Sequence, residues 1–183
     1  FMEFEEALSA WDHRYQQIGS GAFYGNLFHT QVGEVSVFRG HWERAIHYRG
    51  VAPKGTVALA VTLKQSDEGR WLGQCLGLND IIVTGCGVEG EYRSPPLWDT
   101  LVCTIPRAEL AQRIAKITHD DPEKIITRGI ARLSPRMAAH VRRAILTYLG
   151  AIKRLGAGSH AQSMLVEKSS ALVERSEERR VGK

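Results

Sequence analysis

The sequence predicts an α+β fold in which an antiparallel β-sandwich or barrel of about eight short strands is followed by helices. Apolar side chains tend to recur at every second position between residues 23 and 64, as expected of strands with one buried face. Turn residues interrupt the apolar runs every eight to twelve positions, which favours antiparallel strands over alternating βα units. After Pro106 the apolar spacing becomes helical.

Strands are expected from the alternating runs and the turns between them. VAPKG, with Pro53 and Gly55 as breakers, precedes TVALAVTLK, the most apolar run and therefore a central strand. Glycines interrupt the later runs, as at turns or bulges. The predicted strands cover 23–31, 34–39, 43–49, 56–64, a segment beginning at RWLG (70–73), 79–87, 89–94 and 97–106.

Helices are expected at both ends of the strand-rich region. Phe4, Leu8 and Trp11 predict a short amphipathic helix over 2–17. The stretch PRAELAQRIAKI predicts a helix that packs through Leu110, Ile114 and Ile117, and HDDPEK is then expected to break it. Residues 156–160, GAGSH, are typical of a linker, and AQSMLVEKSSALVE (161–174) predicts a weaker helical stretch.

The best-defined helix is predicted after residue 134. Ser134 is a good N-cap and Pro135 suits the first helical position. The helix carries an apolar stripe at spacings of three and four. Such a stripe either packs on its own domain or forms a dimer contact, and both interpretations stay open. The stripe consists of Met137, Val141, Ile145, Tyr148, Ile152 and Leu155.

Composition excludes several classes of protein. No run of about 18 apolar residues is present, so no membrane span is predicted. The acidic N-terminus is not a signal peptide. Cys75, Cys86 and Cys103 show no CxxC spacing and are expected to be small hydrophobic residues in a reduced, cytoplasmic compartment. The net charge is +4, of which +2 comes from 175–183, so the rest of the chain is not expected to bind DNA directly.

Reactive motifs are weak. No HxH pair is present, although His41, Glu43 and His47 could meet on one strand face. No GxSxG elbow occurs, and GCGVEG lacks the Lys-Ser/Thr pair of a phosphate loop. We therefore expect no catalytic residue, no metal and no cofactor.

A small-molecule pocket inside the sheets is the more plausible site, because such pockets are concave and mostly apolar with a few polar groups. The alternative for each candidate residue is that it only fills the core. The candidate lining residues are Trp42, His47, Trp71, Tyr92 and Trp98.

From Trp11 to about Leu155 the chain resembles the N-terminal sensor domain of AraC/XylS-family transcription regulators. The segments that carry the resemblance are WDHRYQQIGSGAFYGNLFHTQVGEVSVFRG, PKGTVALAVTL, WLG before NDIIVTG, and EGEYRSPPLWDTLVCTIPRAEL. It looks nearest to ethanolamine-operon regulators. The resemblance implies a cupin-like β-barrel that senses a small effector, helices that form a homodimer, and no chemistry.

The resemblance also implies a division of the chain. Residues 1–105 would form the β-rich sensor domain and 106–155 the helical packing and dimerisation segment. Residues 156–174 would be a linker and the start of a truncated region, because the family binds DNA through a helix-turn-helix domain C-terminal to the sensor. The tail RSEERRVGK (175–183) resembles a translated sequencing adapter, and Phe1 precedes the first Met, so we expect a fragment.

Two other functions remain open at this stage. A cupin-type metal-dependent enzyme, such as an isomerase or dioxygenase, would need a metal or a His/Glu pair facing the barrel interior. A stand-alone ligand-binding module would need neither a dimer nor a DNA-binding part. The effector, the operator and the direction of regulation are not encoded in any motif of the sequence.

Overall fold

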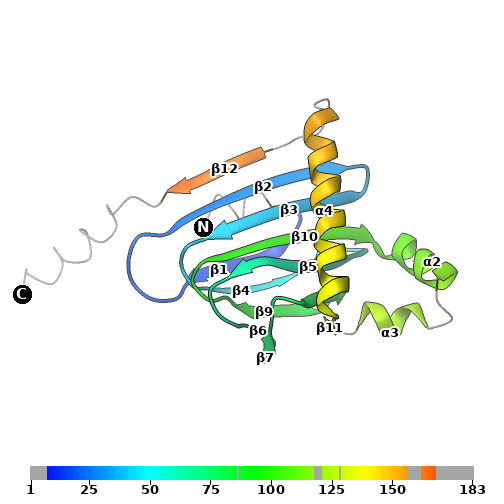
Figure 1. Ribbon diagram of the computed structural model, residues 1–183, viewed down its shortest axis with the longest axis horizontal. Helices are drawn as coiled ribbons and strands as arrows, with labels where there is room; N and C mark the ends of the chain where they lie inside the picture. The colour runs from blue at the N-terminus through cyan, green and yellow to red at the C-terminus, as the bar shows by residue number, and fades with distance from the viewer. Residues whose placement is uncertain (1–7, 86, 118–120, 128, 156–161, 168–183) are drawn as a thin grey trace, which may run out of the picture.

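The computed structural model describes residues 8–85, 87–117, 121–127, 129–155 and 162–167. Two antiparallel β-sheets, one of seven strands and one of five, pack face to face, and helices follow in the C-terminal part (Figure 1). The predicted α+β fold is therefore confirmed, and the sheets form a sandwich rather than a closed barrel. None of the helices in the described part of the chain is long and apolar enough to cross a membrane.

The larger sheet contains the central strand that the sequence predicts. β5 lies between β8 and β10, and all neighbouring pairs in the sheet are antiparallel. The order across the sheet is β11 (Gly129–Arg132), β8 (Asp80–Gly85), β5 (Thr56–Gln65), β10 (Trp98–Pro106), β3 (Val35–Trp42), β2 (Tyr24–Val32) and β12 (Gln162–Glu167).

The smaller sheet covers one face of the larger one. Its short hairpin between β6 and β7 turns through Leu72 and Gly73, both with positive φ, which is the conformation that tight two-residue hairpin turns require. The order across the sheet is β1 (Asp12–Gln17), β4 (Ile46–Val51), β9 (Glu89–Arg93), β6 (Gly69–Trp71) and β7 (Gln74–Leu76).

β5 shows how the alternating pattern produces two separate cores. Ala58 and Ala60 face the smaller sheet and belong to the core between the sheets. Val57 and Val61 point the other way, into the core beneath the helices. Since successive side chains of a strand point to opposite faces, one strand lines both cores. On β5, the side chains that point towards the smaller sheet are smaller than those on the opposite face.

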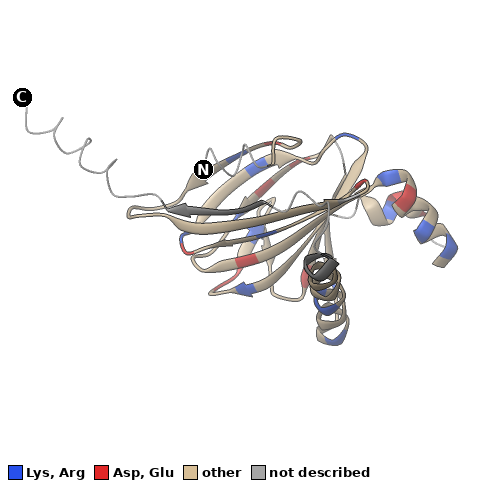
Figure 2. Cartoon of the chain, turned by 90° about the horizontal axis from the view of Figure 1, so that it is seen from above, with Lys and Arg blue, Asp and Glu red and all other residues tan. Residues whose placement is uncertain are grey.

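The helices lie beside the larger sheet: the longest crosses its outer face, and the two shorter ones lie beyond the end of its strands (Figure 1). They are α2 (Arg107–Ile117), α3 (Pro122–Ile126) and α4 (Pro135–Leu155). The Ser134 hydroxyl accepts a hydrogen bond from the Met137 N–H at 3.3 Å, so the predicted N-cap is confirmed. α4 crosses the strands β3, β10 and β5 in Figure 1, and Figure 2 shows it beside one face of the sheet.

Three sequence predictions of secondary structure are wrong, and one further strand was not predicted. Residues 12–17 form strand β1 instead of part of a helix, because His13 and Tyr15 alternate with polar residues and pack against Tyr48 of the neighbouring strand β4. Gln162–Glu167 forms strand β12 instead of a helix, because it pairs with β2, whose backbone groups would otherwise be unpaired at that edge.

The third wrong prediction and the strand that was not predicted lie between the helices. The expected break contains helix α3, where Asp121 caps the N-terminus by accepting from the Glu123 N–H, and a strand, β11, follows and pairs with β8. Ile117 is 81% exposed, unlike Leu110 and Ile114, which pack on the outer core. Residues 2–7, 156–161 and 168–183, and the predictions made for them, lie outside the described residues.

Candidate ligand site between the sheets

An internal cavity of about 60 Å³ lies between the two sheets. On the same scale a single water needs only about 10–15 Å³. The two alanines of β5, Ala58 and Ala60, form part of its wall, and their short side chains leave the space that larger residues would fill. The lining consists of Leu8, Trp11, Tyr15, Phe38, Trp42, Ile46, Tyr48, Ala58, Ala60, Trp71, Ile82, Thr84, Tyr92, Trp98, Thr100 and Val102.

Aromatic rings form one wall of the cavity. Trp98 packs against Trp42 and Tyr92, with ring centroids 4.9 and 4.5 Å away. Tyr15 contacts both Trp42 and Tyr48. The chain has four tryptophans, and all four line this cavity: Trp11, Trp42, Trp71 and Trp98.

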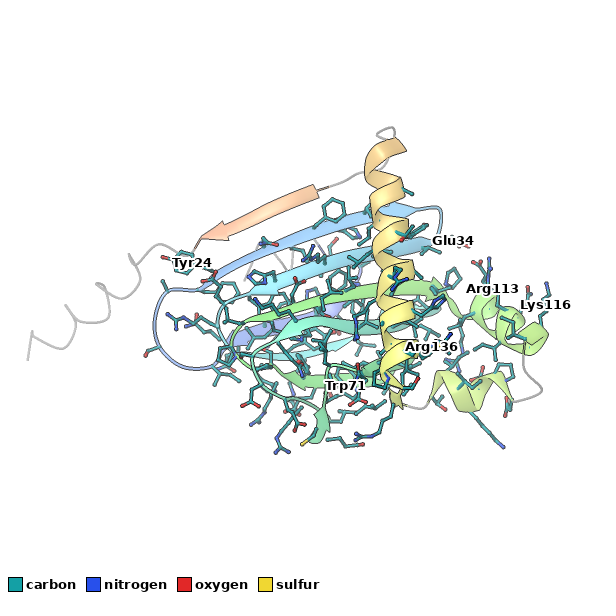
Figure 3. All side chains as sticks on the ribbon, viewed as in Figure 1. Tyr24, Glu34, Trp71, Arg113, Lys116 and Arg136 are labelled. Carbon is teal, nitrogen blue, oxygen red and sulfur yellow. The ribbon has the colours of Figure 1, made fainter. Side chains whose placement is uncertain are left out.

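Glycines on the smaller sheet allow these rings to lie close to the backbone. A Cβ at Gly90 would overlap the indole of Trp71, and one at Gly69 would overlap the ring of Tyr92. Trp71 comes from β6, at the lower part of the view in Figure 3. Because a glycine has no side chain, each ring can cover its neighbouring strand, which holds it in one orientation.

Several polar atoms are buried in this aromatic environment. The Trp98 indole donates to the Thr62 hydroxyl at 3.4 Å, and the Thr100 hydroxyl donates to the Val61 carbonyl at 3.1 Å. In contrast, Trp71 Nε1, Tyr92 Oη and Thr84 Oγ1 have no hydrogen-bond partner within the described residues. Burial also raises the pKa of Tyr92 well above its usual range, so its hydroxyl keeps its proton at neutral pH.

Four of the five predicted lining residues border the cavity. They are Trp42, Trp71, Tyr92 and Trp98, which are 2% to 6% exposed. His47 lies on the opposite face of β4, where its Nε2 is 2.9 Å from the Glu91 carboxylate. Its neighbour Tyr48 faces the cavity instead. Alternation with buried Ile46 would have identified Tyr48, because residues 46 and 48 share a face.

Leu8, Trp11 and Tyr15 were also missed. Their spacing predicts a helix, in which they would not share one strand face. Trp11 packs edge-on against Phe38 at 5.8 Å, and Leu8 is 3% exposed. These residues bring the N-terminal part of the described chain against the cavity.

The outer face of the smaller sheet is polar. Arg49 and Arg93 flank Glu91, with nitrogen–oxygen distances of 3.8 and 3.4 Å. The hydrogen bond from His47 and the charges of the two arginines hold the pKa of Glu91 below its ordinary value. Arg14 lies opposite Arg49 in the sheet, and Asp12 and Glu89 lie on the same face, so this face is charged with both signs.

α4 presents two different faces. Val141, Ile145 and Leu149 pack against the outer core of the larger sheet. Met137 and Tyr148 are 51% and 39% exposed. The predicted apolar stripe is thus divided between packing on its own domain and exposure. The side chains of Ile152 and Leu155, also part of that stripe, lie outside the described residues.

A basic groove lies between α4 and the larger sheet. It is bordered by Arg39, Lys64, Arg142 and Asp99. Arg39 donates two hydrogen bonds to Asp99, at 2.9 and 2.5 Å. Arg142 donates to the Leu78 carbonyl at 2.6 Å, which ties α4 to the turn before β8.

No group of three His, Cys, Asp or Glu side chains within the described residues is placed to hold a metal ion. Cys75 and Cys103 are free thiols, and Cys86 lies outside the described part of the chain. His41 and Glu43, considered above as ligands with His47, are not brought into such a group.

A comparison with solved structures finds a protein of similar fold. The fold is similar to that of the AraC-like transcriptional activator CuxR. The two structures superpose with a TM-score of 0.59 at 13% sequence identity, over 86% of this chain and 57% of that one. No family model matches the chain, and no curated protein matches it. The chain therefore shares a fold with CuxR and spans little more than half of its length.

Proposed function

We propose that this chain is the small-molecule-sensing and dimerising part of a transcription regulator. The observation that carries the proposal is the aromatic cavity between the two sheets within a fold similar to that of an AraC-like activator. The sequence segments quoted above support membership of the AraC/XylS family. The same segments are the basis for proposing that the chain belongs to the ethanolamine-operon branch of that family. We propose that DNA binding belongs to a helix-turn-helix part that this sequence does not include.

The larger sheet offers a short route from the cavity to α4. Ala58 and Ala60 border the cavity, while Val61 of the same strand packs in the core that contains Leu149 of α4. A ligand that favours one arrangement of β5 would therefore favour one placement of α4. Such a ligand acts only through its difference in affinity for the two arrangements.

We propose that α4 forms the dimer contact through its exposed face. Met137 and Tyr148 are large exposed apolar residues on this helix, and Leu146 is 41% exposed. α4 contains five basic and no acidic residues. Because the basic side chains of two copies repel each other, they have to lie at the rim of the dimer contact, where water and salt screen their charges.

The test of sensing uses the 183-residue chain and a panel of small metabolites. A cognate effector is expected to raise the melting temperature in a saturable manner and to change the emission of the tryptophans, all of which line the cavity. An Ala60→Leu variant, which fills the cavity, should lose both responses. If no compound in a broad panel changes either signal, the sensing function is wrong.

The test of dimerisation is sedimentation velocity over a range of protein concentrations. We expect a reversible dimer that Tyr148→Ala weakens without loss of folding. Arg113→Ala is the matched control, because Arg113 is an exposed residue of α2, away from α4 in Figure 3. A strict monomer at high concentration would contradict the dimer. A stoichiometric bound transition metal in the purified protein would instead favour the enzyme alternative.

A further inference from the structure

We propose that the cavity between the sheets receives a small apolar molecule without any polar group, such as a hydrocarbon of about four to six carbons. This inference rests on the proposed sensing function and specifies the chemical class of the effector. Three properties of the cavity lead to it: the absence of ionic groups in its wall, the direction in which the uncharged polar groups of the wall point, and its size.

The wall contains no ionic side chain. None of the sixteen lining residues is Asp, Glu, Lys, Arg or His. The ion pairs of Glu91 with Arg49 and Arg93 lie on the other face of the smaller sheet. Burial of a carboxylate or an ammonium without a counter-ion costs far more than burial of a neutral polar group. A charged effector is therefore strongly disfavoured.

Two tyrosine hydroxyls of the wall are directed at glycines of the smaller sheet rather than into the cavity. A Cβ at Gly69 would overlap Tyr92 Oη, and one at Gly50 would overlap Tyr48 Oη. Each hydroxyl therefore lies over the backbone of a glycine, while ring carbons of the same tyrosine border the cavity. Tyr92 Oη also has almost no accessible surface, so it offers no hydrogen bond to a ligand.

Indole and threonine groups of the wall are likewise kept from the cavity. The Trp98 indole donates to the hydroxyl of Thr62, which does not line the cavity. The Thr100 hydroxyl donates to the Val61 carbonyl, and Trp71 Nε1 is buried against protein atoms. A ligand with a hydroxyl, amine or carbonyl group would lose its hydrogen bonds to water and find no partner in this wall. An apolar ligand does not carry that cost.

The size of the cavity suits a short hydrocarbon. Its volume is about 60 Å³, and a water-sized atom needs about 10–15 Å³, which leaves room for about four to six non-hydrogen atoms. Ala58 and Ala60 keep this space open on one face of β5, whereas Val57 and Val61 fill the core on the other face. Since apolar cavities stay dry, a hydrocarbon that enters one displaces no bound water and gains contacts with the wall.

The experiment compares three five-membered rings that differ in one ring atom: cyclopentane, tetrahydrofuran and pyrrolidinium. Titration calorimetry of the 183-residue chain at neutral pH, with tryptophan emission in parallel, measures each affinity. We expect cyclopentane to bind, tetrahydrofuran to bind about tenfold more weakly because its oxygen finds no donor, and pyrrolidinium not to bind. Equal or tighter binding of tetrahydrofuran or pyrrolidinium overturns the inference, and so does the failure of cyclopentane to bind.

Variants locate the binding and separate this inference from the proposed function. Ala60→Leu should abolish cyclopentane binding, while Lys64→Leu, at an exposed position of the same strand outside the lining, should retain it. Ile82→Val removes one methyl group from the wall and should raise the affinity for cyclohexane relative to cyclopentane. Cyclopentane binding that neither variant of the wall changes overturns the inference. A polar compound of the metabolite panel that binds and is blocked by Ala60→Leu would overturn the apolar class and leave the sensing function intact.

Discussion

The indole of Trp71 lies on the backbone of Gly90, on the neighbouring strand, so closely that a Cβ at Gly90 would overlap the ring. This contact joins β6 to β9 and fixes one aromatic wall of the cavity. It also explains why a glycine stands in a strand interior, where it would otherwise weaken the sheet.

Replacement of Gly90 by alanine should therefore displace Trp71. We expect a loss of about 1–3 kcal/mol in the free energy of unfolding, as for an overpacked core, and a shift in tryptophan emission. Chemical denaturation followed by fluorescence measures both. Gly77→Ala is the matched control, because its Cβ would meet only Asp80 Oδ2, at an ordinary 3.6 Å. Equal stability of both variants would contradict the role of Gly90.

Adjacent residues of α4 should have different effects. Leu149 is 6% exposed in the outer core, so Leu149→Ala should lower the free energy of unfolding by about 2–5 kcal/mol. Tyr148 is 39% exposed, and Tyr148→Ala should change stability by less than about 1 kcal/mol. Urea denaturation at low protein concentration, where association is minimal, compares the two. A similar loss in both variants would show that α4 packs differently.

The two described thiols should differ in reactivity. Burial raises the pKa of Cys103 to about 11, so only a small fraction is thiolate, the reactive form, at pH 8. Cys75 is exposed on β7. We expect iodoacetamide at pH 8 to label Cys75 in the folded protein, whereas Cys103 reacts only after unfolding. Peptide mass spectrometry assigns the label. Rapid labelling of Cys103 in the native state would contradict its burial.

Glu91 should contribute to stability in a pH-dependent manner. The hydrogen bond with His47, together with the charges of Arg49 and Arg93, lowers its pKa below 4.5 in the folded protein. A carboxylate of lowered pKa stabilises the fold above its unfolded pKa, and this contribution disappears as the pH falls through the lowered value.

The matched comparison is between the wild type and Glu91→Gln. We expect the difference in their free energies of unfolding to shrink as the pH falls from about 5 to below 4.5. Denaturation at a series of pH values measures it. A difference that grows as the pH falls through this range would have the wrong sign for the lowered pKa of Glu91.

Local patterns predicted much of this fold. Alternation of apolar residues indicated eight of the strands within a few positions, because the period of two depends only on adjacent residues. Ser134 and Pro135 marked the start of α4, because capping is a contact within one turn of helix. In the cavity wall, aromatic residue type was sufficient to identify Trp42, Trp71, Tyr92 and Trp98.

Other features depend on contacts between distant parts of the chain. Gln162–Glu167 is a strand because β2 offers it an edge, and residues 12–17 are a strand because β4 pairs with them. Whether Tyr48 or His47 faces the cavity depends on which side of the smaller sheet meets the larger one. Periodicity tells which side chains share a face, but the burial of that face is set by the partner against which it packs.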